Sequence, residues 1–249
     1  MVWLMAAIIL GSEADFTEIS ARLDCDLGSA YLGQNLLEQA ESEFRDALEL
    51  IPGYHDALLG LGMVYSRRGS WETAERYLRS YVDSVPGSAR GCMELAEVLR
   101  ATGRSAESSL FALRAAESSP DDPACWLLAG ETALSAGDTS SASTFLQRAM
   151  PLGGRPALEA ATLQAGILLS LGDEDTARAL LEEAWGAGHA EAGWLLGRLY
   201  TSWGDYLRGL SLISQALSCA PRAPFADSAR MLLDSLAGEG VFLSPGDGE

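Results

Sequence analysis

Three prolines spaced by 34 residues constrain the fold of this chain more than any other feature of its sequence. They are Pro52, Pro86 and Pro120. A proline ends a helix because it has no N–H to donate and its ring collides with the preceding turn. A period between about 20 and 50 residues is the sequence signature of repeat architectures. The chain is therefore predicted to consist of helical units of 34 residues.

Three further columns of residues keep the same register over six units. One column of small residues contains Gly28, Gly62, Ala96, Gly130, Ala165 and Gly197. A second contains Ala40, Ala74, Ser108, Ala142, Ala177 and Gly209. A column of turn residues contains Asn35, Gly69, Gly103, Gly137, Gly172 and Gly204. Small residues in two facing columns let two helix axes approach closely, so each unit is predicted to be a pair of packed helices.

The second unit shows the expected helices most clearly. Apolar residues at helical spacing predict a first helix over 54–67 and a second helix over 71–84. Gly69 is expected to end the first helix in the left-handed conformation, and Pro86 follows the second. One such pair cannot bury its apolar face alone, so neighbouring pairs must stack.

In this pattern the chain resembles the tetratricopeptide repeat (TPR) family over residues 21–222. The first unit has the family's residues at Leu27, Gly28, Tyr31, Ala40, Phe44, Ala47 and Pro52. Departures include Ser108 in place of a small alanine and Gln164 in place of a leucine. The resemblance implies an all-α fold, a right-handed superhelical solenoid of about six TPR helix-turn-helix units plus a C-terminal capping helix. We expect repeats over 21–223 with a kink near Gly153, a capping helix over 224–237, and a flexible tail over 238–249.

The N-terminal segment, residues 1–20, has two interpretations. Val2 to Leu10 is an apolar run of the length of a signal-peptide core, with small residues Ser12 and Ala14 before a possible cleavage point. The run has no basic residues before it, so it is equally consistent with an apolar segment that packs on the first helices. Localisation therefore stays open between cytoplasmic and exported to the periplasm or envelope, and contact with a membrane is expected only if the segment is retained.

Composition excludes several classes of function. The net charge is −18, and all 17 cationic side chains are arginines, so a lysine-dependent phosphate loop or Schiff base is excluded. Such an acidic chain repels nucleic acid. The four cysteines are far apart and are expected to be small buried residues, and neither histidine has metal-ligand spacing. We expect no metal, no cofactor and no enzymatic activity, and interpret acidic pairs such as Asp121–Asp122 as solvated charges near helix ends.

The candidate site comes from the resemblance. In TPR proteins the first helix of each unit lines a concave groove that takes a peptide or a partner segment. Position by position, this implies a lining of Leu59, Met63, Met93, Glu97, Leu127, Glu131, Trp194 and Arg198, with Cys25, Ser29, Thr162 and Gly166 at the same positions of the other units. Packing between adjacent first helices explains Met63, Met93 and Leu127 equally well.

The functional prediction is a non-catalytic scaffold for protein–protein interaction. The lysines and asparagines with which some TPR proteins grip a C-terminal carboxylate do not stand at these positions, so we expect no carboxylate clamp. Alternatives are an exported envelope or pilus-type assembly factor, or a non-catalytic subunit of an enzyme complex. The acidity is concentrated in the first unit, the fifth unit and the two ends, whereas residues 55–88 and 123–157 are neutral. We therefore expect the recognition surface in units two to four.

Overall fold

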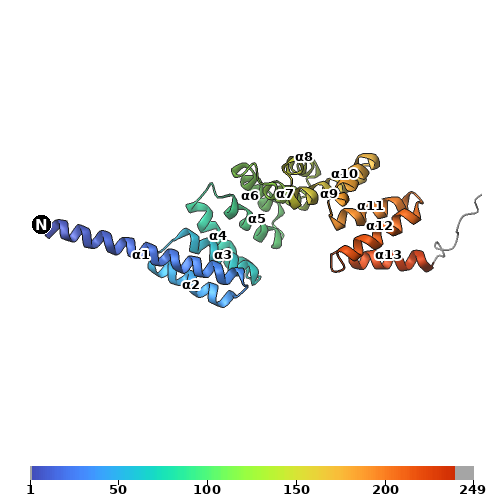
Figure 1. Cartoon of the computed structure of the whole chain (residues 1–249). Helices are drawn as coiled ribbons and strands as arrows, with labels where there is room; N and C mark the ends of the chain where they lie inside the picture. Colours follow the sequence, from blue (N-terminus) through green and yellow to red (C-terminus); the bar gives the residue numbers. More distant parts are fainter. Residues whose placement is uncertain (1, 239–249) are drawn as a thin grey trace, which may run out of the picture. The chain divides into compact units, whose positions relative to one another are not determined.

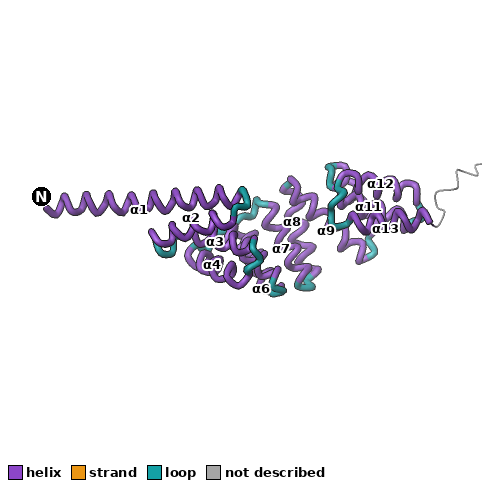
Figure 2. The backbone as a smooth tube through the Cα atoms, turned by 90° about the horizontal axis from the view of Figure 1, so that it is seen from below, coloured by secondary structure: helices purple, strands orange, loops and turns teal. Residues whose placement is uncertain are grey.

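The computed structural model describes residues 2–238, with side chains for residues 16–236. Throughout these residues the chain forms helices joined by short turns, and no strand occurs in the part described. Figure 1 shows the helices following one another in chain order, and Figure 2 shows that short loops join them. The all-α class predicted from the sequence is confirmed.

Six helix pairs and one terminal helix make up the fold. The pairs are α1 (Val2–Gly33) with α2 (Leu37–Leu50), α3 (His55–Arg67) with α4 (Trp71–Ser84), α5 (Ala89–Ala101) with α6 (Ser105–Ser118), α7 (Pro123–Ser135) with α8 (Thr139–Ala149), α9 (Gly154–Leu171) with α10 (Glu174–Gly186), and α11 (Ala190–Ser202) with α12 (Tyr206–Cys219). The terminal helix is α13 (Ala226–Gly238). Below, helix A and helix B denote the first and second helix of a pair. The six-repeat solenoid with a capping helix is thereby confirmed.

The turn inside each pair has the geometry that its sequence column predicts. The glycines of the turn column have φ values between 72° and 83°, and Asn35 has φ 59°. Glycine adopts this left-handed conformation without steric cost, and asparagine tolerates it better than most residues. The residue after the turn donates its N–H to a carbonyl five residues earlier, as Ser70 does to Tyr65 at 2.9 Å, which satisfies the end of helix A.

Small residues bring helix A and helix B of one pair into close contact. A Cβ placed on Gly62 would lie 2.6 Å from the Leu78 side chain, and one on Gly130 would lie 2.6 Å from Leu146. Ser108, the exception in its column, is fully buried and donates its hydroxyl to the carbonyl of Ala96 at 2.7 Å. The hydroxyl therefore stays hydrogen-bonded at a position where the other units have no polar group.

The described chain divides into two compact units. The first comprises residues 2–120 with 131–138, and the second comprises 121–130 with 139–238, so the division falls within α7. The first has a core around Phe44 and Leu61, extended by Tyr31 and Tyr54. The second has cores around Leu181 and around Ile213.

A short 3₁₀ helix, η1 (Met150–Leu152), marks the join at which the kink was predicted. Gly153 and Gly154 follow it, with φ of 79° and 75°, and they redirect the chain into α9. α9 has 18 residues, whereas α3, α5 and α11 have 13 each, so the fifth unit departs from the regular repeat length.

At the N-terminus, α1 is one continuous helix of 32 residues, so the predicted segment boundary at residue 20 lies inside it. The side chains of the apolar run lie outside those that the structure describes, as does the predicted tail beyond Gly238. Within the described residues, no helix combines the length and hydropathy required to cross a bilayer.

One expectation about the cysteines is wrong. Cys25, Cys92 and Cys125 are buried as expected, but Cys219 is exposed. It ends α12, where the chain turns toward α13 and leaves that side of the helix open.

Candidate functional site on the A helices of the first unit

The A helices of the first two repeats enclose a hollow of about 240 Å³. Cys25 and Ser29 line it from α1, and Leu59 and Met63 line it from α3. These residues occupy equivalent positions 34 residues apart, so the repeat itself brings them together. Of the predicted lining residues, Leu59 and Met63 therefore share one hollow.

The floor of this hollow is apolar and its sides are charged. Leu59 and Met63 are half-buried, and Phe44 reaches the hollow from α2. Asp26 and Asp56 contribute carboxylates to its lining. A ligand in the hollow would therefore meet apolar surface and acidic groups together.

Two arginines complete the lining and are held in place by local contacts. The Arg67 guanidinium donates to the carbonyl oxygen of Leu32, and Arg90 Nη2 approaches the Met63 sulfur at 3.6 Å. Both arginines come from helix A, one at the end of α3 and one near the start of α5. The hollow therefore presents charges of both signs around an apolar floor.

The Cys25 thiol at the base of the hollow is unreactive. Burial raises its pKa to about 12, and the negative charges of Asp56, Asp24 and Asp26 act in the same direction. Because the thiolate is the nucleophilic form of cysteine, this side chain remains a protonated thiol at neutral pH. Glu94, on α5, also has a raised pKa because it is buried, although the charge of Arg90 opposes the effect.

The predicted residues on α5 and α7 have their own environments. Met93 and Glu97 are half-buried on α5, and Glu97 pairs with Arg100 at 2.5 Å. On α7, Leu127 is buried and Glu131 is half-buried. The division of the chain falls between these last two residues.

Trp194 and Arg198, on α11, form a different kind of contact. The Trp194 ring is only 7% exposed and stacks on Phe225, with ring centroids 6.0 Å apart and planes inclined by 9°. The Arg198 guanidinium lies over the Trp194 ring itself, 5.5 Å from its centroid. This tryptophan therefore joins α11 to the segment that leads into α13.

The charged lining of the hollow was missed in the sequence. Asp56 and Arg90 are 34 residues apart and are each the second residue of their A helix, so the repeat register contained the signal. The two residues have opposite charges, so they do not stand out as a column of one residue type.

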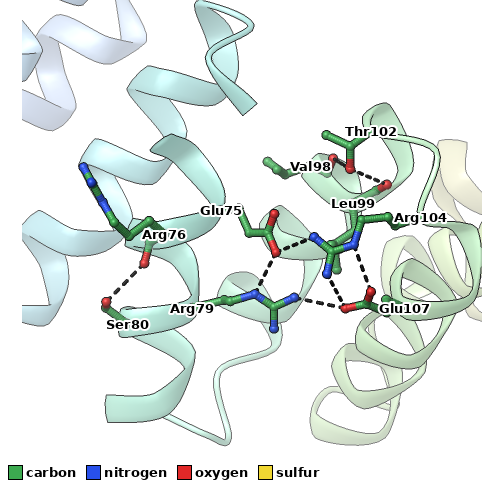
Figure 3. A network of polar contacts seen from close by, with 9 residues as sticks. All are labelled: Glu75, Arg76, Arg79, Ser80, Val98, Leu99, Thr102, Arg104 and Glu107. Carbon is green, nitrogen blue, oxygen red and sulfur yellow. Dashed lines mark hydrogen bonds and ion pairs between the residues drawn. The ribbon is translucent and has the colours of Figure 1, made fainter. Parts of the chain in front are cut away.

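Ion pairs between neighbouring repeats were also missed, because the sequence offers each arginine many acidic partners. Glu75 on α4 accepts from Arg79 at 2.8 Å and from Arg104, at the start of the next B helix, at 2.6 Å. Arg79 and Arg104 also bond to Glu107, at 3.0 Å and 2.6 Å. Figure 3 shows these four side chains as one closed network linking two repeats.

Among residues 16–236, no group of three or more histidine, cysteine, aspartate or glutamate side chains is arranged to hold a metal ion.

A sequence model of the tetratricopeptide repeat matches residues 25–89 and again 59–123. This chain contains tetratricopeptide repeats. No curated protein matches the sequence. The two matched stretches cover the hollow and the helices α2 to α6 around it.

Solved TPR structures share the fold at low sequence identity. Pseudomonas aeruginosa pilF has a TM-score of 0.73 and 21% identity, covering 86% of this chain and 98% of its own. Cut9 in the APC/C hetero-tetramer Cut9–Hcn1 has a TM-score of 0.67 and 16% identity, covering 90% of this chain and 44% of its own. YrrB, described as a TPR protein with an unusual peptide-binding site, has a TM-score of 0.56 and 18% identity, covering 76% and 97%.

Proposed function

We propose that the chain is a non-catalytic interaction module that binds a peptide or a partner segment along the A helices of its first unit. The observation that carries the proposal is the hollow that Cys25, Ser29, Leu59 and Met63 line together. Met63 is a flexible and polarisable side chain, of the kind that adapts to partners of different shape. The peptide-binding TPR protein YrrB shares the fold and supports the same type of function.

The lining determines which peptides the hollow favours. Fully burying one leucine or methionine side chain contributes about 1.5–3 kcal/mol, so an apolar anchor residue on the peptide provides most of the affinity. Asp26 and Asp56 favour a cationic neighbour of that anchor, and Arg67 and Arg90 favour an anionic one. We therefore expect ligands with one or two apolar residues flanked by charges of both signs.

A selection of random peptides displayed on phage tests the proposal. The full chain is immobilised, and selected peptides are synthesised and titrated by fluorescence anisotropy. Met63→Glu puts a charge on the floor of the hollow and is expected to weaken binding at least tenfold, which corresponds to about 1.4 kcal/mol.

The matched control is Leu110→Glu, because Leu110 is an exposed apolar residue on α6, outside the hollow. Circular dichroism confirms that both variants fold. Equal loss of binding in both variants, or no loss in Met63→Glu, contradicts the assignment of the site.

An exported assembly factor that uses the same solenoid is the second candidate. The apolar run at Val2–Leu10 and the small residues Ser12 and Ala14 support it. Expression in a bacterial host followed by mass spectrometry of the purified N-terminus tests it. A mature chain beginning at Asp15 supports export, whereas an intact N-terminus in the cytoplasmic fraction contradicts it.

A further inference from the structure

An exposed apolar stripe runs along α1 on the side away from the hollow. Phe16, Ile19, Leu23 and Leu27 are 73%, 64%, 57% and 42% exposed. Their spacing of three and four residues places them on one face of the helix. Cys25, by contrast, is buried and lines the hollow from the opposite face of the same helix.

Two of the four stripe residues, Leu23 and Leu27, have equivalents in the following repeats, and these equivalents are covered. Leu27 corresponds to Leu61 and Leu95, which are both 0% exposed. Leu23 corresponds to Ala57 and Gly91, and both of these are buried. Leu23 and Leu27 on α1 are therefore exposed at positions that are buried on α3 and α5, although they are at least as apolar as the residues found there.

The element that covers the later A helices is helix B of the preceding repeat. Phe44 on α2 lies so close to Gly60 that any Cβ there would clash with its ring. Tyr81 on α4 lies equally close to Gly91. A helix of this kind does not cover Phe16, Ile19, Leu23 or Leu27, and Figures 1 and 2 show the N-terminal part of α1 extending past α2.

The charges beside the stripe indicate what kind of helix could pack on it. Residues 13–26 contain Glu13, Asp15, Glu18, Asp24 and Asp26 but only one arginine, Arg22. In the described part, Asp26 is exposed at the edge of the stripe, between it and the hollow that it also lines, and Asp24 is half-buried beside the other edge, whereas the exposed Glu18 lies on the opposite side of the helix. A second copy of α1 would bring the carboxylates of Asp24 and Asp26 together, whereas a helix with basic flanks would pair with them.

We propose that the stripe formed by Phe16, Ile19, Leu23 and Leu27 docks an amphipathic helix of a partner protein whose apolar face is flanked by lysine or arginine. The helix lies where helix B of a preceding repeat would lie. This surface is separate from the hollow, so the chain has two binding faces that one partner or two partners can use.

Designed peptides of about 18 residues, long enough to form a helix, provide the test. One peptide has leucines along one face and lysines beside them, a second has glutamates in place of the lysines, and a third has the composition of the first in scrambled order. Each is titrated into the full chain by fluorescence anisotropy. We expect the first peptide to bind at least tenfold more tightly than either of the others.

Variants of the chain locate the binding. Leu23→Ser with Leu27→Ser is expected to weaken the first peptide at least tenfold, while Leu110→Ser and Met63→Glu leave its binding unchanged. Circular dichroism and sedimentation velocity verify folding and oligomeric state. Equal binding of the scrambled peptide overturns the proposal, because charge alone then suffices. Dimers of the free chain that Leu23→Ser and Leu27→Ser dissociate also overturn it, because a second copy is then the occupant.

Discussion

The two units of the chain hold neighbouring repeats together by different means. In the first unit, carboxylates on B helices bond to arginines of the following repeat: Glu41 pairs with Arg68, and Glu75 pairs with Arg104 at 2.6 Å. Glu41 and Glu75 are 34 residues apart, so the same type of ion pair recurs at equivalent positions of two successive repeats. In the second unit, the carboxylates of α10 accept instead from uncharged donors of the following repeat, Glu182 from Tyr200 at 3.0 Å and Glu174 from Trp203 at 2.6 Å. The stacked rings of Trp194 and Phe225 also join α11 to the segment that leads into α13.

The close contact inside a helix pair differs between Gly62 in the first unit and Gly197 in the second. The three atoms nearest to a Cβ on Gly62 all belong to the Leu78 side chain. A Cβ on Gly197 would meet the Ile213 side chain at 2.6 Å and also the backbone of α12, with the Gly209 carbonyl oxygen at 2.9 Å. Side chains rotate to accommodate a change, whereas a helical backbone must shift as a whole. The contact at Gly62 can therefore yield by movement of one side chain, whereas the contact at Gly197 requires two helices to move apart.

Removing the Trp194 ring is expected to have the largest effect. Trp194→Ala deletes the centre of the second unit's last core and should reduce the free energy of unfolding of that unit by about 3–5 kcal/mol. Hydrogen exchange measured by mass spectrometry should show loss of protection in α11 and α13. Leu207→Ala is the control, since Leu207 lies in the same unit on α12 and is 80% exposed. A loss no larger than that of the control contradicts the structural role of Trp194 and favours its role in the predicted groove.

Glycine-to-alanine changes at equivalent positions test the difference in packing directly. Gly197→Ala should destabilise the second unit by about 2–3 kcal/mol, because overpacking against backbone outweighs the gain in helix propensity. Gly62→Ala should cost the first unit less than Gly197→Ala costs the second, because the new Cβ meets the Leu78 side chain and no backbone atom is among its three nearest neighbours. Urea unfolding of the two variants measures both values. Equal costs would show that the two interfaces do not differ in rigidity.

Glu41→Gln tests the ion pairs of the first unit. Burial raises the pKa of Glu41, but hydrogen bonds from Tyr65 and Arg68 outweigh burial and hold the pKa below its ordinary value. Since the carboxylate form is favoured in the folded state, its contribution is present above the unfolded pKa and is lost as pH falls through the folded pKa. At neutral pH, Glu41→Gln should cost about 1–2 kcal/mol.

The pH dependence distinguishes this effect from a simple loss of packing. Wild type and Glu41→Gln should converge in stability below the ordinary glutamate pKa of about 4.3. Glu38→Gln is the matched control, because Glu38 contacts the same Arg68 at 3.3 Å but its side chain is 83% exposed. The ion-pair role of Glu41 is contradicted if Glu38→Gln lowers the free energy of unfolding as much as Glu41→Gln does. It is also contradicted if the stability difference between wild type and Glu41→Gln persists in acid.

The smallest effect is expected where an ion pair lies within one helix of the second unit. Arg155 pairs with Glu159 at 2.8 Å, but the arginine side chain is 84% exposed. Arg155→Ala should change stability by less than about 0.5 kcal/mol, because exposed pairs of this kind contribute little. A larger loss in urea unfolding would show that charge also matters in the second unit.

The sequence predicted the helix pairs because local backbone rules determine them. Gly69 requires a left-handed turn and Pro86 ends a helix, so the predicted ranges 54–67 and 71–84 match α3 and α4 within one residue. Pairs such as Glu41 and Arg68, 27 residues apart, could not be singled out, because an acidic chain offers each arginine many possible partners.

Residues of the candidate site could be predicted where their helix has a further repeat before it and after it. Leu59 and Met63 lie between α1 and α5, and the repeat register places them in the hollow. Trp194 has the same register in α11, but Phe225, which lies outside the repeat, covers it. The end of a repeat array is where positional inference is weakest, since the neighbours there no longer follow the period.

The order of contacts within the first unit has a mechanical consequence. α1 to α6 pack mainly on their neighbours in sequence, and no helix closes the array by packing the last pair onto the first. A pulling force applied to the ends of this unit would therefore pass through the repeats in series and would not be shared among them. A repeat at one end could open and reform against its folded neighbour, so the unit would extend in steps under load and recover quickly, since only local contacts must be rebuilt.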